Sequence, residues 1–170
     1  QAKLAEPSFL KLGWGTQFLD ADLDGNSDLI VTNGHVHDPI DSKIPYQMPA
    51  QFFRNLGNGS FHELSASEVG LFFERPQLGR ALARLDWNRD GRDDACISHL
   101  NSPSSLLSNR TETASHFLSL RLVAVNSARD AIGTQVRVVT GEGTTTMQLT
   151  AGDGFQASND KPKALFALLY

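Results

Sequence analysis

The feature that most constrains this chain is a nine-residue acidic pattern that occurs twice. The first copy runs from Asp20 to Asp28 and the second from Asp86 to Asp94, and both fit D-x-[DN]-x-D-G-x-x-D. Each copy holds four of the chain's 19 acidic residues. Carboxylates at this density repel one another unless a cation lies between them. The pattern therefore predicts two cation sites built from oxygen ligands.

The spacing suits calcium, a hard cation that takes six to eight oxygens at about 2.3–2.6 Å. A tightly curled chain points the side chains at positions 1, 3 and 5 toward one centre. The glycine at position 6 permits the sharp turn, because glycine adopts positive φ at little cost. Position 7 then offers its backbone carbonyl, and the aspartate at position 9 closes the shell. The expected ligands are Asp20, Asp22, Asp24, Asn26 and Asp28 in the first loop, and Asp86, Asn88, Asp90, Arg92 and Asp94 in the second.

The second calcium site is expected to be the weaker one. Asn88 replaces a carboxylate there, and Arg89 and Arg92 add positive charge. An EF-hand is excluded, because position 12 carries Val31 or Ile97 where that loop needs glutamate. Zinc is disfavoured by the all-oxygen donor set, and magnesium by its preference for bound water. The remaining alternative is a pair of ion-free Asp-Gly surface turns.

The hydrophobic pattern predicts an all-β protein. Short apolar runs rich in β-forming residues alternate with turn clusters, and no window carries a helical stripe over three turns. Residues 29–32 and 95–98 follow the acidic loops as strand candidates. Residues 51–54 and 60–64 flank Asn58-Gly59, a dipeptide typical of hairpin turns. At most one or two short helical turns are expected.

An internal repeat indicates how the strands are grouped. Gly15–Asp20 aligns with Arg80–Asp86 if a gap of one residue is allowed. Repeats of short strands are typical of propeller blades. The acidic loops then stop, and longer alternating strands follow from about His116. We therefore expect about two propeller-type blades in residues 1–115, followed by a small β-sandwich or barrel-like domain in residues 116–170.

These motifs resemble two known families. The acidic loops, Gly34-His35-Val36 and the run from Phe53 to Phe61 resemble FG-GAP/VCBS repeats, the calcium-loop blades related to those of integrin α-subunits. Residues 127–136 and the glycine-aromatic turn at 152–158 resemble the ASPIC/UnbV domain, which follows such repeats in relatives of cartilage acidic protein. The resemblance implies a secreted or envelope protein that binds a protein or glycan ligand. Since a closed propeller needs at least about four blades, we expect a C-terminal fragment whose remaining blades lie in a parent chain.

The expected function is a calcium-dependent structural, adhesion or ligand-recognition module, and not an enzyme. No G-x-S-x-G elbow, P-loop, G-x-G-x-x-G or H-E-x-x-H motif is present. The alternative is a calcium-assisted polysaccharide-acting enzyme that uses His35, His37 or His99 as its base. The net charge of −4 argues against nucleic acid as a partner. No run approaches the roughly 20 apolar residues of a membrane span.

Two further pairs of residues have a functional and a structural interpretation. His35 and His37 would face the same way on a strand and could share a metal, but a turn in which they make hydrogen bonds is preferred. Trp14 and Trp87 could form a carbohydrate platform, but packing between strands is preferred.

Overall fold

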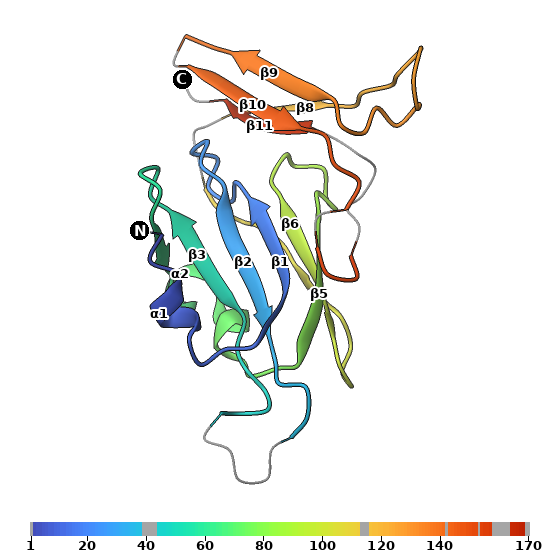
Figure 1. The fold of residues 1–170 in the computed structure, drawn as a ribbon. Coiled ribbons are helices and arrows are strands. Elements are labelled where there is room, and N and C mark those ends of the chain that lie inside the picture. Colours follow the sequence, from blue (N-terminus) through green and yellow to red (C-terminus); the bar gives the residue numbers. More distant parts are fainter. Residues whose placement is uncertain are drawn as a thin grey trace.

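The computed structural model describes residues 2–38, 44–112, 116–141, 143–152, 154–157 and 164–168 (Figure 1). Antiparallel strands make up most of this part, which confirms the all-β prediction. Three short helical turns accompany them, one more than the sequence predicts. They are α1 (Ala5–Ser8), α2 (Ala66–Val69) and the 3-10 turn η1 (Leu71–Glu74).

Two antiparallel sheets follow one another along the first part of the chain. The first contains β1 (Gly13–Leu19), β2 (Asp28–Asn33), β3 (Gln51–Asn55) and β4 (Phe61–Glu63), paired in that order. The expected hairpin around Asn58-Gly59 is present as β3–β4. The second sheet contains β5 (Gly79–Leu85), β6 (Asp94–His99) and β7 (Ser105–Leu107), again in chain order.

The two sheets repeat each other residue for residue in their first two strands. Leu19 lies opposite Asp28 in the first sheet, and Leu85 lies opposite Asp94 in the second. Both first strands also carry an irregularity after their opening glycine, Gly13 or Gly79. The predicted alignment, which placed a gap of one residue between the two repeats, is therefore wrong. The repeat is colinear, because these equivalent positions are separated by the same number of residues throughout both strands.

The sheets contact each other closely along β1 and β5. A Cβ on Gly15 would lie 2.6 Å from the carbonyl oxygen of Arg80 and 2.6 Å from the nitrogen of Leu82. Thr32 Oγ1 joins the two strands, because it accepts a hydrogen bond from Gly15 N at 2.9 Å and donates one to Arg80 O at 2.8 Å. The core cluster draws on both sheets and contains Leu19, Ile30, Phe52, Leu82, Ala95 and Ile97.

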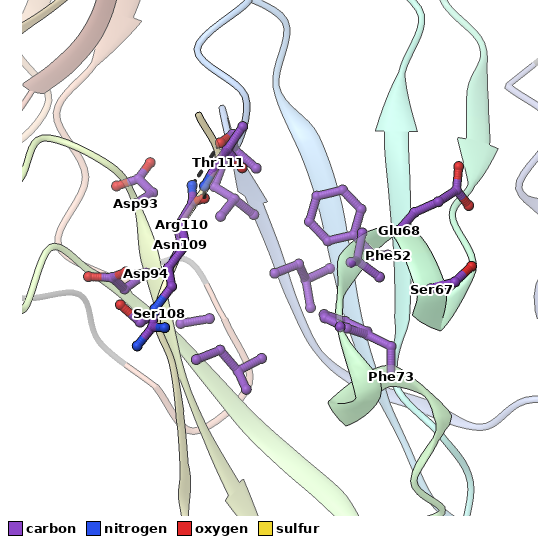
Figure 2. Close-up of a pocket in the computed structure, with 17 residues that line it drawn as sticks. Phe52, Ser67, Glu68, Phe73, Asp93, Asp94, Ser108, Asn109, Arg110 and Thr111 are labelled. Atoms are coloured by element: carbon purple, nitrogen blue, oxygen red, sulfur yellow. Dashed lines mark hydrogen bonds between the residues drawn. The ribbon is translucent and has the colours of Figure 1, made fainter. Parts of the chain in front are cut away.

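Away from this contact the sheets diverge. A cavity of about 540 Å³ lies between their outer parts (Figure 2). Figure 2 shows Phe52 and Phe73 on one side of it and residues 108–111 on the other. The sheets therefore meet at their first strands and are spaced apart towards β3 and β7.

The last four strands form two further pairs. β8 (His116–Leu120) pairs with β11 (Ala164–Leu168), and β9 (Gln135–Val139) pairs with β10 (Thr144–Gln148). Figure 1 shows these strands at the end of the two sheets that also carries the acidic loops. The ring of Phe117 would collide with a Cβ on Gly91 of the second loop, so β8 touches that loop directly. The predicted boundary at residues 115/116 and the sandwich or barrel architecture stay predictions.

No helix in the described ranges is long and apolar enough to cross a membrane.

The close approach of β1 to β5 predicts a strong effect of one methyl group. Gly15→Ala would push Cβ into the backbone of β5, so we expect the free energy of unfolding to fall by about 1–3 kcal/mol. Urea titration followed by tryptophan fluorescence measures the change. Gly141→Ala is the matched control, because a Cβ there meets nothing within 4 Å. Equal stability of the two variants would show that β1 and β5 do not approach this closely.

Candidate metal centre

The first acidic loop joins β1 to β2 and curls around its own carboxylates. Asp20 accepts hydrogen bonds from the backbone N–H groups of Asp24 and Gly25, each at 3.0 Å. Asp24 in turn accepts one from Asn26 N at 2.8 Å. Leu23 and Gly25 have positive φ angles of 56° and 85°, so the chain reverses within a few residues. The aspartate spacing thus produces the tight turn that the sequence predicts.

Three of the expected ligands come together in this turn. Ligand oxygens of Asp20, Asp22 and Asp24 all lie within 4.8 Å of one another. Oxygens on opposite sides of one calcium ion are about 4.6–5.2 Å apart, so these three fit around a single ion. Asp22 Oδ1 is also buried and has no hydrogen-bond partner in the described part of the chain. A cation would satisfy this oxygen, so the donor set fits calcium.

A guanidinium group lies beside these carboxylates. Arg54, on β3, places Nη2 2.7 Å from Asp22 Oδ2 and 3.9 Å from Asp24 Oδ2. The Arg54 side chain is 48% exposed, so the ion pair contributes at most about 1 kcal/mol. Arg54 therefore neutralises part of the charge and competes with a cation for Asp22. The sequence pattern did not single out this residue, which lies outside the nine-residue loop.

Asp28 occupies a different place from the other aspartates of the loop. It is the first residue of β2, is 1% exposed, and accepts hydrogen bonds from Ala21 N at 3.2 Å and Asn55 N at 2.8 Å. Its carboxylate thus ties the start of the loop to the end of β3. Asp28 is not among the three clustered ligands, and its coordination of an ion stays a prediction, as does that of the Asn26 carbonyl.

The loop holds its negative charge at a cost. Burial raises the pKa of Asp20 to about 7, against the lowering effect of the Gly25 N–H group, and the charges of Asp24 and Asp22 raise it further. Burial also raises the pKa of Asp28 to about 6, although the Asn55 N–H group opposes this shift. A carboxyl group whose pKa is raised in this way is ionised unfavourably, and a bound divalent cation would offset the penalty.

The second acidic loop follows the same backbone path. Asp86 accepts hydrogen bonds from Asp90 N at 3.1 Å and Gly91 N at 3.3 Å. Arg89 and Gly91 have φ angles of 60° and 81°, matching the positive values in the first loop. Asp94 repeats the role of Asp28, because it is 1% exposed and accepts hydrogen bonds from the backbone of Trp87 and Asn109.

The charges of the second loop are already compensated from within. Asp90 Oδ2 lies 2.6 Å from Arg92 Nη2 and accepts a hydrogen bond from Asn88 Nδ2 at 2.8 Å. Burial favours a higher pKa for Asp90, but the hydrogen bonds from Arg92 and Asn88 hold it below its ordinary value. Within the described ranges, the only cluster of three potential metal-ligating His, Cys, Asp or Glu side chains is in the first loop. The geometry therefore favours the first loop over the second as a site for a cation.

Two asparagines connect the loops to the sheets and were missed by the sequence pattern. Asn55 ends β3, and its Nδ2 donates to Ser27 O at 2.9 Å. Asn109 follows β7, and its Nδ2 donates to Ala21 O at 2.7 Å, so it reaches from the second sheet to the first loop. The available signal was an asparagine at the end of the third strand or just after it in each repeat.

The histidines proposed as bases lie away from the acidic loops. His99 pairs with Gly79 at one end of the β5–β6 ladder, whereas Asp94 pairs with Leu85 at the other end. His35 follows the end of β2 opposite Asp28, and its Nδ1 lies 2.8 Å from His37 O. The turn in which the two histidines make hydrogen bonds is therefore confirmed.

The two tryptophans differ in their surroundings. The Trp14 ring lies 5.2 Å from that of Phe155, and the guanidinium of Arg80 lies 4.5 Å from the Trp14 ring centre. Trp14 therefore packs between segments, as expected. Trp87 is 52% exposed and donates a hydrogen bond to Ser108 Oγ at 3.3 Å. The packing role expected for Trp87 is therefore wrong, because its loop projects beyond the ends of the strands.

The fold defines an all-β protein of antiparallel sheets, and one comparison narrows this class for the C-terminal part. Residues 124–168 match the family described as ASPIC and UnbV. This segment contains residues 127–136 and the glycine-aromatic turn at 152–158, of which residues 153 and 158 lie outside the described part. No curated protein matches the chain. The resemblance of residues 1–115 to FG-GAP/VCBS repeats stays a prediction.

The contact between Asn109 and the first loop predicts a loss of stability when the amide is removed. Asn109→Ala deletes the bond to Ala21 O and also the bond that Asn109 Oδ1 accepts from Thr111 N at 3.0 Å. We expect the free energy of unfolding to fall by about 1–2 kcal/mol, measured by urea titration in chelator. Asn126→Ala, at an exposed position, is the control. Unchanged stability of Asn109→Ala would contradict a structural link between the sheets at this point.

Proposed function

We propose that this chain is a calcium-binding structural, adhesion or ligand-recognition module whose first acidic loop holds the stronger of two calcium ions. The observation that carries the proposal is the cluster of Asp20, Asp22 and Asp24, in which a buried carboxylate oxygen of Asp22 has no partner among the described residues. Calcium would satisfy this oxygen and offset the cost of ionising Asp20. The second loop binds calcium more weakly, because Arg92 already compensates Asp90.

We further propose that the two sheets are adjacent blades of a β-propeller. Supporting this, their strands repeat the same register, their acidic loops lie at the same end, and they diverge outward from the β1–β5 contact. Blades arranged around a central axis have this geometry. The remaining blades would belong to a parent chain. In such a blade the calcium ion holds the loop between the first two strands in place.

The C-terminal segment and the resemblances support a recognition role in a secreted or envelope protein. Residues 116–170 would form the ASPIC/UnbV domain, and its contact between Phe117 and Gly91 would make it sensitive to the state of the second loop. A protein or glycan ligand is the proposed partner. Recognition is preferred over polysaccharide cleavage, because His35, His37 and His99 lie at the strand ends away from the acidic loops.

Calcium titration of chelator-treated protein tests the metal site. We expect calorimetric heat of binding and a rise in melting temperature, since a ligand that binds only the folded state stabilises it. Asp22→Asn should weaken the tighter site at least about tenfold, because a charged ligand is lost. Asp90→Asn should change only the weaker phase, and the remote Asp130→Asn should change neither. Absence of both heat and thermal stabilisation in the wild-type chain would refute the calcium proposal.

Arg54 predicts an unusual gain of affinity. Arg54→Met removes the group that competes for Asp22, so calcium should bind the first loop about two- to fivefold more tightly, the range expected for an exposed ion pair of up to about 1 kcal/mol. The measurement is calorimetry at low ionic strength, where exposed charges are least screened. Arg121→Met removes the same charge at an exposed position on another part of the chain and should leave the affinity unchanged. Weaker binding by Arg54→Met would mean that Arg54 supports the site.

Ligand recognition is tested separately on glycan and protein arrays with and without chelator. Binding that disappears in chelator would link recognition to the ions, whereas binding that persists would restrict calcium to a structural role.

A further inference from the structure

A second, much smaller cavity lies between the two sheets, away from the acidic loops. Its volume is about 10 Å³, and residues from both sheets line it, including Asn33 of β2 and His99 of β6. Gln77, from the segment before β5, contributes a third polar side chain to the lining. A cavity of this size accommodates about one water molecule.

Three buried polar atoms with unused hydrogen-bonding capacity belong to these residues. Asn33 Oδ1, Gln77 Oε1 and His99 Nδ1 have no hydrogen-bond partner in the described ranges, and they are three of only five such side-chain atoms there. Buried polar groups are nearly always paired with protein or with ordered water. Their gathering around one cavity therefore points to a shared partner.

The surrounding contacts fix these groups in place. Asn33 Nδ2 donates to Pro49 O at 3.0 Å and to Gln51 Oε1 at 3.2 Å. If the amide rotated by half a turn, its oxygen would face these two acceptors, so the orientation with Oδ1 unpaired is the favourable one. The backbone of Gln77 exchanges hydrogen bonds with that of Met48 at 2.9 and 3.1 Å. These contacts hold the Asn33 amide and the backbone of Gln77 beside the cavity.

We propose that this cavity binds one water molecule, which bridges Asn33, Gln77 and His99 and forms part of the contact between the two sheets. A water molecule has two protons to donate, and the two amide oxygens accept them. Its remaining capacity is as an acceptor, and the donor is His99 Nδ1–H. The other imidazole nitrogen, Nε2, then accepts a hydrogen bond from Ser105 Oγ, which lies 2.9 Å away. Each of the three unpaired atoms then has a partner.

The protonated nitrogen of His99 distinguishes water from a cation. Burial lowers the pKa of His99, so the ring is neutral near pH 7 and carries one proton. If Nε2–H donated to Ser105, the cavity would face three lone-pair acceptors, which is the donor set of a metal ion. Among the described residues, no carboxylate lines the cavity. Arg75 does line it, and this positive charge repels a cation. One water molecule can satisfy all three atoms only if the proton is on Nδ1.

The test is nuclear magnetic resonance of the uniformly ¹⁵N-labelled full chain in chelator at pH 7.5. Long-range proton–nitrogen correlation of the His99 ring, assigned by its loss in His99→Gln, should show a protonated Nδ1 and an unprotonated Nε2. Cross-relaxation at the water frequency should also reach protons beside the cavity, such as the Ile97 methyls. A ring protonated on Nε2, or absence of this cross-relaxation, would overturn the proposal.

A variant tests the contribution of one partner without the histidine. Gln77→Met keeps the side-chain length but removes an acceptor, so the cross-relaxation from water to Ile97 should weaken strongly. Gln135→Met, at an exposed position on β9, is the matched control and should leave it unchanged. Full retention of the water signal in Gln77→Met would show that Gln77 does not hold the molecule. Because every measurement is made in chelator, the result is independent of calcium binding.

Discussion

The structure depends on two buried carboxylates, Asp28 and Asp94, each placed where an acidic loop enters its second strand. Each accepts one backbone N–H from the beginning of its own loop and one from the end of the third strand. A single side chain thereby fixes the loop, the first hairpin and the third strand relative to one another. Since both groups are 1% exposed, no solvent can replace these bonds. Within this frame, hydrogen bonds from the loop backbone orient the other aspartates, such as Asp20 and Asp86.

On that common frame the two loops differ in how their charge is compensated. In the first loop the compensating guanidinium comes from Arg54 on another strand, and a buried oxygen of Asp22 is left without a partner in the described part of the chain. In the second, Arg92 within the loop pairs with Asp90 through both its backbone and its side chain. The first loop thus keeps a carboxylate oxygen that a cation could satisfy, whereas Arg92 already pairs with Asp90 in the second loop. Similar backbone paths can therefore carry different patterns of charge compensation.

Much of the fold was predictable because its signals are local. The Asp-Gly spacing predicted the turn, and Asn58-Gly59 predicted the β3–β4 hairpin, since both depend on residues adjacent in sequence. Arg54 and Asn109 were not predictable, because each acts on a loop that is remote in sequence. The exposure of Trp87 was missed for a related reason. Hydrophobicity indicates that a side chain favours burial, but whether it is buried depends on which segments pack against it. The gap placed in the repeat was wrong because the first strands of both sheets carry the same irregularity, so neither repeat is longer than the other there.

The contact between the sheets is polar as well as apolar. Along β1 and β5 the backbones approach so closely that Thr32 bonds to both strands, and Asn109 reaches the first loop from the second sheet. Leu82 and Ile97 provide a fully buried apolar centre between these bonds. Hydrogen bonds weaken steeply when they are misaligned, so bonds at separated points constrain how the sheets are oriented. The polar contacts therefore limit the angle between the sheets, and in a propeller that angle would decide whether further sheets could close around a common axis.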